Sequence, residues 1–156
     1  MKVFELLNPK CILTDFKSSN KDEVINELVD LLDGDDRVID IEEVRKCIFD
    51  REKIMSTGVG KGFAIPHGKT NSITDILAAF GRSYKPIEYD SLDGEPVQLV
   101  FLLVGKDNLV GKHIKLLSRI SRLMNNEDFR IKLVEAKSKE AILKIFEEEE
   151  QSYSDV

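Results

Sequence analysis

The sequence predicts an α/β domain in which apolar strands alternate with amphipathic helices. Short apolar runs, of which residues 99–104 form the longest, have the composition of buried strands. Longer segments between and after them repeat apolar residues every three or four positions, as helices do. With 156 residues, the chain is long enough for one domain with a substantial core. We therefore expect a single domain over residues 1–150 and a polar tail over residues 151–156.

Two helices are predicted in the first third of the chain. Asn20 can cap a helix over residues 21–32, which Gly34 then stops. Asp40 can cap a second helix, and two glutamates in its first turn complement the positive end of its dipole. Arg51 lies at or just after the last turn of this second helix.

A short strand is predicted over residues 63–65, directly before Pro66. The proline ring excludes the α region at the preceding residue, so residue 65 stays extended. We expect His67 to begin a turn from this strand into a loop. Gly68 has no side chain, which would let a ligand or partner approach the imidazole from that side.

Two further strands are predicted over residues 76–81 and 97–104. The second is so apolar that we expect it in the middle of a sheet covered on both faces. Residues 85–96 contain two prolines and an Asp-Gly pair, which are typical of loops. These residues are therefore expected to connect the two strands.

Three helices are predicted in the last third of the chain. An apolar stripe over residues 114–124 has helical spacing and ends at Asn125. Asn126 can cap a short helix, and Ser138 can cap the last one. The glutamates at residues 147–150 are expected to form a solvated helix end.

The composition indicates a globular protein of a reducing compartment. The net charge of −6 argues against generic nucleic-acid binding and favours a basic partner. Cys11 and Cys47 are too few for a disulfide framework and lack metal-site spacing, so we expect two core residues in a cytoplasmic protein. We expect neither a signal peptide nor a membrane span, because the longest apolar run is far below the roughly 20 residues that a bilayer requires.

The glycine-rich segment over residues 58–62, G-V-G-K-G, invites comparison with a phosphate-binding loop. The Walker pattern needs a glycine where Met55 stands and a serine or threonine where Gly62 stands. The segment also precedes a predicted strand instead of following one. We therefore expect a flexible turn and no nucleotide site.

His67 is the first candidate for chemistry. A neutral imidazole is a good nucleophile near neutral pH, because one nitrogen can attack while the other keeps its proton. Attack on phosphorus would give a phosphohistidine and needs no general base. The alternative is an ordinary surface or core histidine, but the flanking Pro66 and Gly68 favour the chemical role.

His113 and Arg51 are two further candidates. His113 lies near the start of a predicted helix, where backbone N–H groups can bind a phosphoryl oxygen to which the imidazole also donates. The planar guanidinium of Arg51 suits bidentate contact with phosphoryl oxygens. The alternatives stay open: His113 as a surface residue beside a loop, and Arg51 in an exposed ion pair near Glu52.

These candidates belong to a longer pattern. Residues 51–69, R-E-K-I-M-S-T-G-V-G-K-G-F-A-I-P-H-G-K, closely resemble the active-site signature of the fructose/mannitol-type IIA domain (EIIA type 2) of the bacterial phosphoenolpyruvate-dependent sugar phosphotransferase system. Residues 92–104 and 113–119 resemble that family's second characteristic segment. The resemblance covers almost the whole chain, about residues 6–146.

The resemblance implies a three-layer α/β/α fold with a mixed central sheet. It also implies that His67 accepts a phosphoryl group on its tele nitrogen from the phosphohistidine of the carrier HPr. Arg51 and His113 would then flank the phosphohistidine, with Thr57 and the N–H groups of the glycine-rich turn as helpers. No metal or organic cofactor is implied.

Two functions stay open within this family. One is a nitrogen-regulatory-type IIA, whose phosphorylation state changes what it binds; the length and the stretch over residues 56–69 favour it. The other is a sugar-uptake component that passes the phosphoryl group to a cysteine of a IIB domain. We expect HPr or its nitrogen-type paralogue as donor, a IIB domain or a regulatory target as acceptor, and neither nucleic acid nor membrane insertion. A metal-dependent hydrolase using His67 and His113 has little support, because no HExxH-like spacing accompanies them.

Overall fold

The computed structural model describes residues 1–153 of the chain. Within this range, one sheet contains β1 (Ile12–Leu13), β2 (Phe63–Ala64), β3 (His67–Thr70), β4 (Leu77–Ile87) and β5 (Val97–Lys106). The helices are α1 (Lys21–Leu32), α2 (Ile41–Ile54), α3 (Val110–Met124), α4 (Glu127–Glu135) and α5 (Lys139–Ser152). Two short 3-10 helices, η1 (Val3–Leu6) and η2 (Pro9–Cys11), precede β1.

The sheet is mixed and is built around β5. On one side β5 pairs antiparallel with β4, which pairs in turn with β1 in parallel. On its other side β5 pairs in parallel first with β2 and then with β3. The apolar run over residues 99–104 therefore lies in the middle of the sheet, as the sequence predicts.

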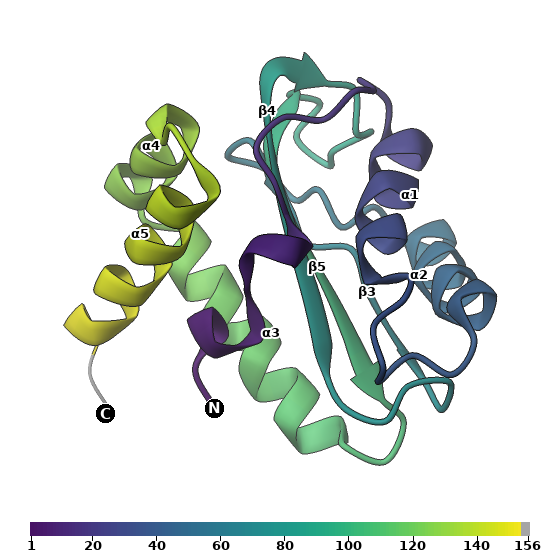
Figure 1. Ribbon diagram of the computed structural model, residues 1–156. Coiled ribbons are helices and arrows are strands. Elements are labelled where there is room, and N and C mark those ends of the chain that lie inside the picture. Colours follow the sequence, from purple (N-terminus) through teal and green to yellow (C-terminus); the bar gives the residue numbers. More distant parts are fainter. Residues whose placement is uncertain (154–156) are drawn as a thin grey trace.

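Helices cover both faces of this sheet (Figure 1). On one face, α1 packs against β4 and α2 against β3. On the other face, α3 packs against β5, α4 against β4 and β5, and α5 against α4. The expected three-layer α/β/α arrangement with a mixed sheet is confirmed.

Side-chain caps start four of the helices where the sequence predicts them. In each case the capping oxygen accepts a backbone N–H of the first turn; the caps are Asn20, Asp40, Asn126 and Ser138. These bonds satisfy N–H groups that have no partner inside the helix. The bounds of α1 are also those predicted.

Strand β4 extends to Ile87, well beyond its predicted end at residue 81. The loop expected from residue 85 therefore begins later. Pro86 is compatible with this strand because the ladder between β4 and β5 is irregular between Arg82 and Ile87. The proline marks an interruption of the ladder rather than the end of the strand.

His67 is the first residue of β3, so the expected turn into a loop is wrong. Pro66 has no N–H for the ladder and separates β2 from β3, while its carbonyl accepts the N–H of Leu103 at 3.0 Å. Gly68 does not open a path to the imidazole either. A Cβ at Gly68 would lie 2.8 Å from both the carbonyl oxygen and Sγ of Cys47, so the missing side chain lets α2 pack on β3.

The C-terminal helix joins the two ends of the domain. Glu150, which the sequence places in a solvated helix end, is buried. Its carboxylate accepts the N–H groups of Val3 and Phe4 at 2.8 and 2.6 Å. Helix α5 continues past residue 150 and Tyr153 packs against the core, so the first part of the expected tail belongs to the domain; residues 154–156 lie outside the described residues. Among the helices described, none has the length and apolar character needed to cross a membrane.

Candidate active site

His67 is held at the start of β3 with one ring nitrogen occupied. Its Nδ1 lies 2.8 Å from the carbonyl oxygen of Ile65. Because a carbonyl oxygen only accepts hydrogen bonds, Nδ1 carries the proton. The lone pair is therefore on Nε2, the tele nitrogen, and the side chain is half-buried. This tautomer leaves Nε2 ready to attack an electrophile.

His113 lies beside His67 although the two residues come from different layers. The ring centroids are 5.8 Å apart, with a tilt of 49° between the planes. His113 belongs to the first turns of α3 and is only 4% exposed, so it is not the surface residue of the alternative interpretation. The structure thus brings the two histidines of the sequence together.

The tautomer of His113 follows from its surroundings. Its Nδ1 is buried and has no hydrogen-bond partner among residues 1–153. It lies against Gly105, where an added Cβ would overlap the imidazole. A buried N–H without an acceptor is rarer than a buried lone pair without a donor, which favours the proton on Nε2. His113 then presents an N–H donor from its other edge.

Both imidazoles have lowered pKa values. Burial is the main cause for His67, and the nearby Arg51 charge acts in the same direction, while the bond to Ile65 opposes it. Burial also lowers the pKa of His113 to about 4, with smaller contributions from the charges of His67 and Lys69. Both rings are therefore neutral at pH 7, so that His67 can act as a nucleophile and His113 as a hydrogen-bond donor.

Arg51 lies in the last turn of α2, near His67. Its Nη1 donates to the carbonyl oxygen of Met55 at 2.8 Å, which ties the guanidinium to the end of the helix. The neighbouring Glu52 pairs with Lys21 instead. A cation at a helix C-terminus is also stabilised by the helix dipole. The charge of Arg51 thus acts on His67, whose ring lies beside that of His113.

Thr57 does not direct its hydroxyl toward the histidines. The hydroxyl donates to Oε1 of Glu52 at 2.6 Å and lies 3.0 Å from the hydroxyl of Tyr89, and the residue is buried. The expectation that the Thr57 side chain helps to stabilise a phosphoryl group is therefore wrong, because that side chain is already bonded inside the domain.

The glycine-rich turn is confirmed as a turn. Gly60 and Gly62 have φ values of 145° and 80°, which residues with a side chain rarely adopt. The glycines therefore serve the backbone conformation of the turn that leads into β2.

Lys69 is a charged neighbour of the site that the sequence reasoning did not single out. Side chains alternate along a strand, so His67 and Lys69 face the same side of β3, opposite to Gly68 and α2. Lys69 pairs with Gly105 on β5, and His113 covers Gly105. The spacing of two residues between His67 and Lys69 could have identified Lys69 from the sequence, because alternate residues of a strand share a face.

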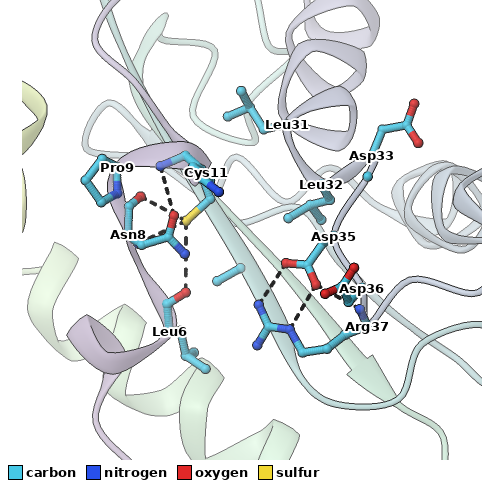
Figure 2. Close-up of a pocket in the computed structure, with 13 residues that line it drawn as sticks. Leu6, Asn8, Pro9, Cys11, Leu31, Leu32, Asp33, Asp35, Asp36 and Arg37 are labelled. Carbon is cyan, nitrogen blue, oxygen red and sulfur yellow. Dashed lines mark hydrogen bonds and ion pairs between the residues drawn. The ribbon is translucent and has the colours of Figure 1, made fainter.

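A large pocket lies in a different part of the fold (Figure 2). It has a volume of about 940 Å³ and lies between η2 and the connection from α1 to α2. The Asp35–Arg37 ion pair and the buried thiol of Cys11 lie in it, and burial raises the pKa of that thiol. His67, Arg51 and His113 do not line it.

Both cysteines are free. Cys11 is buried, as expected of a core residue, whereas Cys47 is only half-buried. Burial raises the pKa of Cys47 to about 12, so its thiol stays protonated. Among residues 1–153, no group of three or more His, Cys, Asp or Glu residues is arranged to hold a metal ion.

Comparisons with known proteins find related sequences over almost the whole chain. The family model described as "Phosphoenolpyruvate-dependent sugar phosphotransferase system, EIIA 2" matches residues 5–149. The PTS system fructose-specific EIIABC component of Bacillus subtilis (strain 168) is 39% identical over 97% of the chain, which spans 24% of that longer protein. The nitrogen regulatory protein of Bradyrhizobium diazoefficiens is 35% identical over 93% of the chain and 94% of its own length.

A solved structure adds evidence at the level of the fold. The nitrogen regulatory protein IIA-Ntr from Neisseria meningitidis superposes with a TM-score of 0.86 and 32% identity, over 92% of this chain and 98% of that one. The site described above falls inside the matched segment. The chain therefore belongs to the EIIA 2 family of the phosphoenolpyruvate-dependent sugar phosphotransferase system.

Proposed function

We propose that this protein is a phosphocarrier that accepts a phosphoryl group on Nε2 of His67 from the phosphohistidine of an HPr-type carrier. The Nε2 lone pair attacks phosphorus, the N–P bond of the donor breaks, and its electron pair returns to the donor imidazole. The observation that carries this proposal is the bond from His67 Nδ1–H to the Ile65 carbonyl, which leaves Nε2 as the nucleophile. The neutral state of the ring makes a general base unnecessary.

Arg51 and His113 stabilise the transferred group in this proposal. In-line phosphoryl transfer depends on positioning and on neutralising the charge of the equatorial oxygens. Arg51 supplies a full positive charge from the end of α2. Neutral His113 donates an N–H from a ring whose centroid lies 5.8 Å from that of His67. The two residues thus act from opposite layers of the domain.

The surroundings of the site suit a protein partner. Exposed apolar side chains lie close in sequence to the site residues; these are Ile54, Met55, Val59, Val110 and Ile114. Exposed Leu92 joins them, because its N–H donates to the carbonyl of Gly58 next to Val59. Such a surface fits transient docking of a carrier, and we propose a cytoplasmic location because the carrier acts there.

For the next step we propose a regulatory role of the nitrogen-regulatory IIA type. This chain matches nearly the whole length of the relative from Bradyrhizobium and of the structure from Neisseria. Both of these are named nitrogen regulatory proteins. A second candidate is passage of the phosphoryl group to a IIB cysteine in sugar uptake. The 39% identity to a fructose-specific EIIABC component favours that alternative.

The first test is labelling with phosphoenolpyruvate, the first enzyme of the system and HPr. We expect His67→Ala to abolish labelling, because the lone pair of the neighbouring His113 is on its buried Nδ1 and not on an accessible nitrogen. Arg51→Ala should slow single-turnover transfer while the fold remains intact. Labelling of His67→Ala at the wild-type rate would remove His67 from the proposed role.

The second test follows the label after it reaches the protein. A stable phosphoprotein that passes nothing to IIB proteins of the same cell, with a target that binds only one phosphorylation state, supports regulation. Rapid onward transfer to a IIB cysteine supports uptake instead.

A further inference from the structure

Glu52 is a buried carboxylate that the proposed transfer does not itself use. Oε2 accepts the N–H of Thr57 at 2.8 Å and pairs with Nζ of Lys21 at 2.9 Å. Oε1 accepts the hydroxyls of Thr57 and Tyr89 at 2.6 and 3.2 Å. The side chain is only 4% exposed, so these partners replace its hydration. One carboxylate thus joins α1, α2 and the segment after α2.

A continuous series of hydrogen bonds leads from Glu52 to the imidazole of His67. Thr57, whose N–H is bonded to Glu52, accepts the N–H of Ile65 on its carbonyl at 3.2 Å. The carbonyl of Ile65 then accepts the Nδ1–H of His67 at 2.8 Å. Each bond begins on the residue where the previous one ends. The position of the Thr57 backbone therefore determines the position of the Ile65 carbonyl, which fixes the tautomer of His67.

The backbone next to Thr57 is also held by packing, at Gly58. A Cβ at Gly58 would lie 2.6 Å from Oγ of Ser91 and 2.8 Å from the ring of Tyr89, so the backbone lies directly on these residues. The carbonyl of Gly58 accepts the N–H of Leu92 at 2.7 Å. Tyr89, itself bonded to Glu52, is thus the surface on which the segment rests.

We propose that Glu52, with Lys21 as its counter-ion, is a positioning residue that fixes the proton of His67 on Nδ1. This inference rests on the proposed function, because it concerns the nitrogen that would attack phosphorus. When Glu52 is lost, the N–H of Thr57 has no acceptor and the segment relaxes. The Ile65 carbonyl then moves relative to the ring, and His67 populates the tautomer whose Nε2 is protonated and cannot attack.

The test compares Glu52→Met with Glu52→Gln. Methionine has a similar volume but no strong acceptor, whereas glutamine keeps an amide oxygen for the Thr57 N–H, and the two hydroxyls can accept from its NH2 group. Imidazole 15N NMR identifies the tautomer of His67 without any phosphoryl donor. We expect a dominant Nδ1–H form in the wild type and in Glu52→Gln, and a mixture of tautomers in Glu52→Met.

The rate of transfer from phosphorylated HPr is the second readout. A misplacement of about 1 Å can cost on the order of 100-fold in rate, and we expect a loss of roughly this size in Glu52→Met. The Glu52→Gln variant should keep most of the wild-type transfer rate. Glu43→Met, an exposed position on the same helix, should change neither readout. Thr57→Val removes the hydroxyl with its contacts to Glu52 and Tyr89 but keeps the N–H, and should keep the Nδ1–H tautomer.

A folded Glu52→Met protein with His67 only in the Nδ1–H form would overturn the proposal. A change of tautomer in Thr57→Val as large as in Glu52→Met would also overturn it, because the hydroxyl and not the backbone would then be responsible. If Glu52→Met does not fold, Glu52→Gln decides: a weaker acceptor should speed exchange of the His67 Nδ1–H with water, and unchanged exchange rejects the proposal. Failure of wild-type transfer would contradict the proposed function and leave the tautomer result standing.

Discussion

Gly105 determines where the second imidazole can lie. A Cβ at this position would overlap Nδ1 of His113, so only glycine lets the ring rest on β5. We expect Gly105→Ala to displace His113 toward solvent, raise its pKa toward the ordinary value and slow phosphoryl transfer. An NMR titration of His113 and single-turnover rates check both effects.

The matched control for this substitution is Gly111→Ala, on the first turn of α3. A Cβ at Gly111 meets nothing within 4 Å, so this change should leave the His113 titration and the transfer rate unchanged. Equal effects of the two substitutions would show that the tight contact at Gly105 is not what places the ring.

The low pKa of His113 makes the free energy of unfolding depend on pH. In the unfolded chain this group titrates near 6.5, whereas in the folded protein burial lowers its pKa to about 4. The unfolded chain therefore binds more protons between these values, and the free energy of unfolding falls as pH falls from about 6.5 to about 4. Urea denaturation across this interval should show a flatter dependence in His113→Gln, and an equal slope would contradict the assignment.

Arg82 joins strand β4 to the end of helix α4. It is fully buried, and its Nη1 donates to the carbonyls of Leu133, Val134 and Ala136 at 2.8 to 2.9 Å. Nε donates to the carbonyl of Thr14 at 2.7 Å. The guanidinium thus satisfies the carbonyls that a helix leaves free at its C-terminus.

Arg82→Met is expected to lower the free energy of unfolding by about 3 kcal/mol, because several buried carbonyls lose a charged donor. Urea denaturation measures the loss. Lys132→Met on the exposed side of α4 is the control and should change stability by less than about 0.5 kcal/mol. Similar losses in both variants would mean that the buried bonds of Arg82 add little.

Elements whose ends are set by local chemistry could be predicted from the sequence. Asn20, Asp40, Asn126 and Ser138 cap helices through their own first turns, so neighbouring residues suffice to identify them. The end of β4 could not be predicted, because it depends on pairing with β5 across an irregular ladder at Pro86. The turn expected at His67 was wrong for the same reason, since β3 is stabilised by its pairing with β5.

At the scale of the whole domain, one carboxylate of the C-terminal helix binds the N-terminal segment. Glu150 of α5 accepts the N–H groups of Val3 and Phe4, and Arg119 of α3 lies 3.9 Å from it. We expect Glu150→Ala to lower the free energy of unfolding by about 2 kcal/mol, because two backbone N–H groups lose their acceptor. Thermal or urea denaturation measures this effect.

Glu148→Ala is the control for the closure of the domain. Glu148 is exposed on the same helix and should change stability by less than about 0.5 kcal/mol. If the Glu150→Ala protein is as stable as Glu148→Ala, apolar packing alone holds η1 against the domain.

The parts of this protein that could be read from the chain are those set by neighbouring residues. They include the apolar strands, the helix caps and the contiguous pattern around His67 that indicates the family. The directions of buried polar groups depend instead on contacts between distant segments. Packing turns the Thr57 hydroxyl to Glu52, places His113 on Gly105 and buries Glu150 against η1. Residues 3 and 150 are 147 positions apart in the chain. Glu52 and Thr57 are close in the chain, but Tyr89 from a distant segment completes their contact. His113 meets Gly105 only because α3 packs back onto β5.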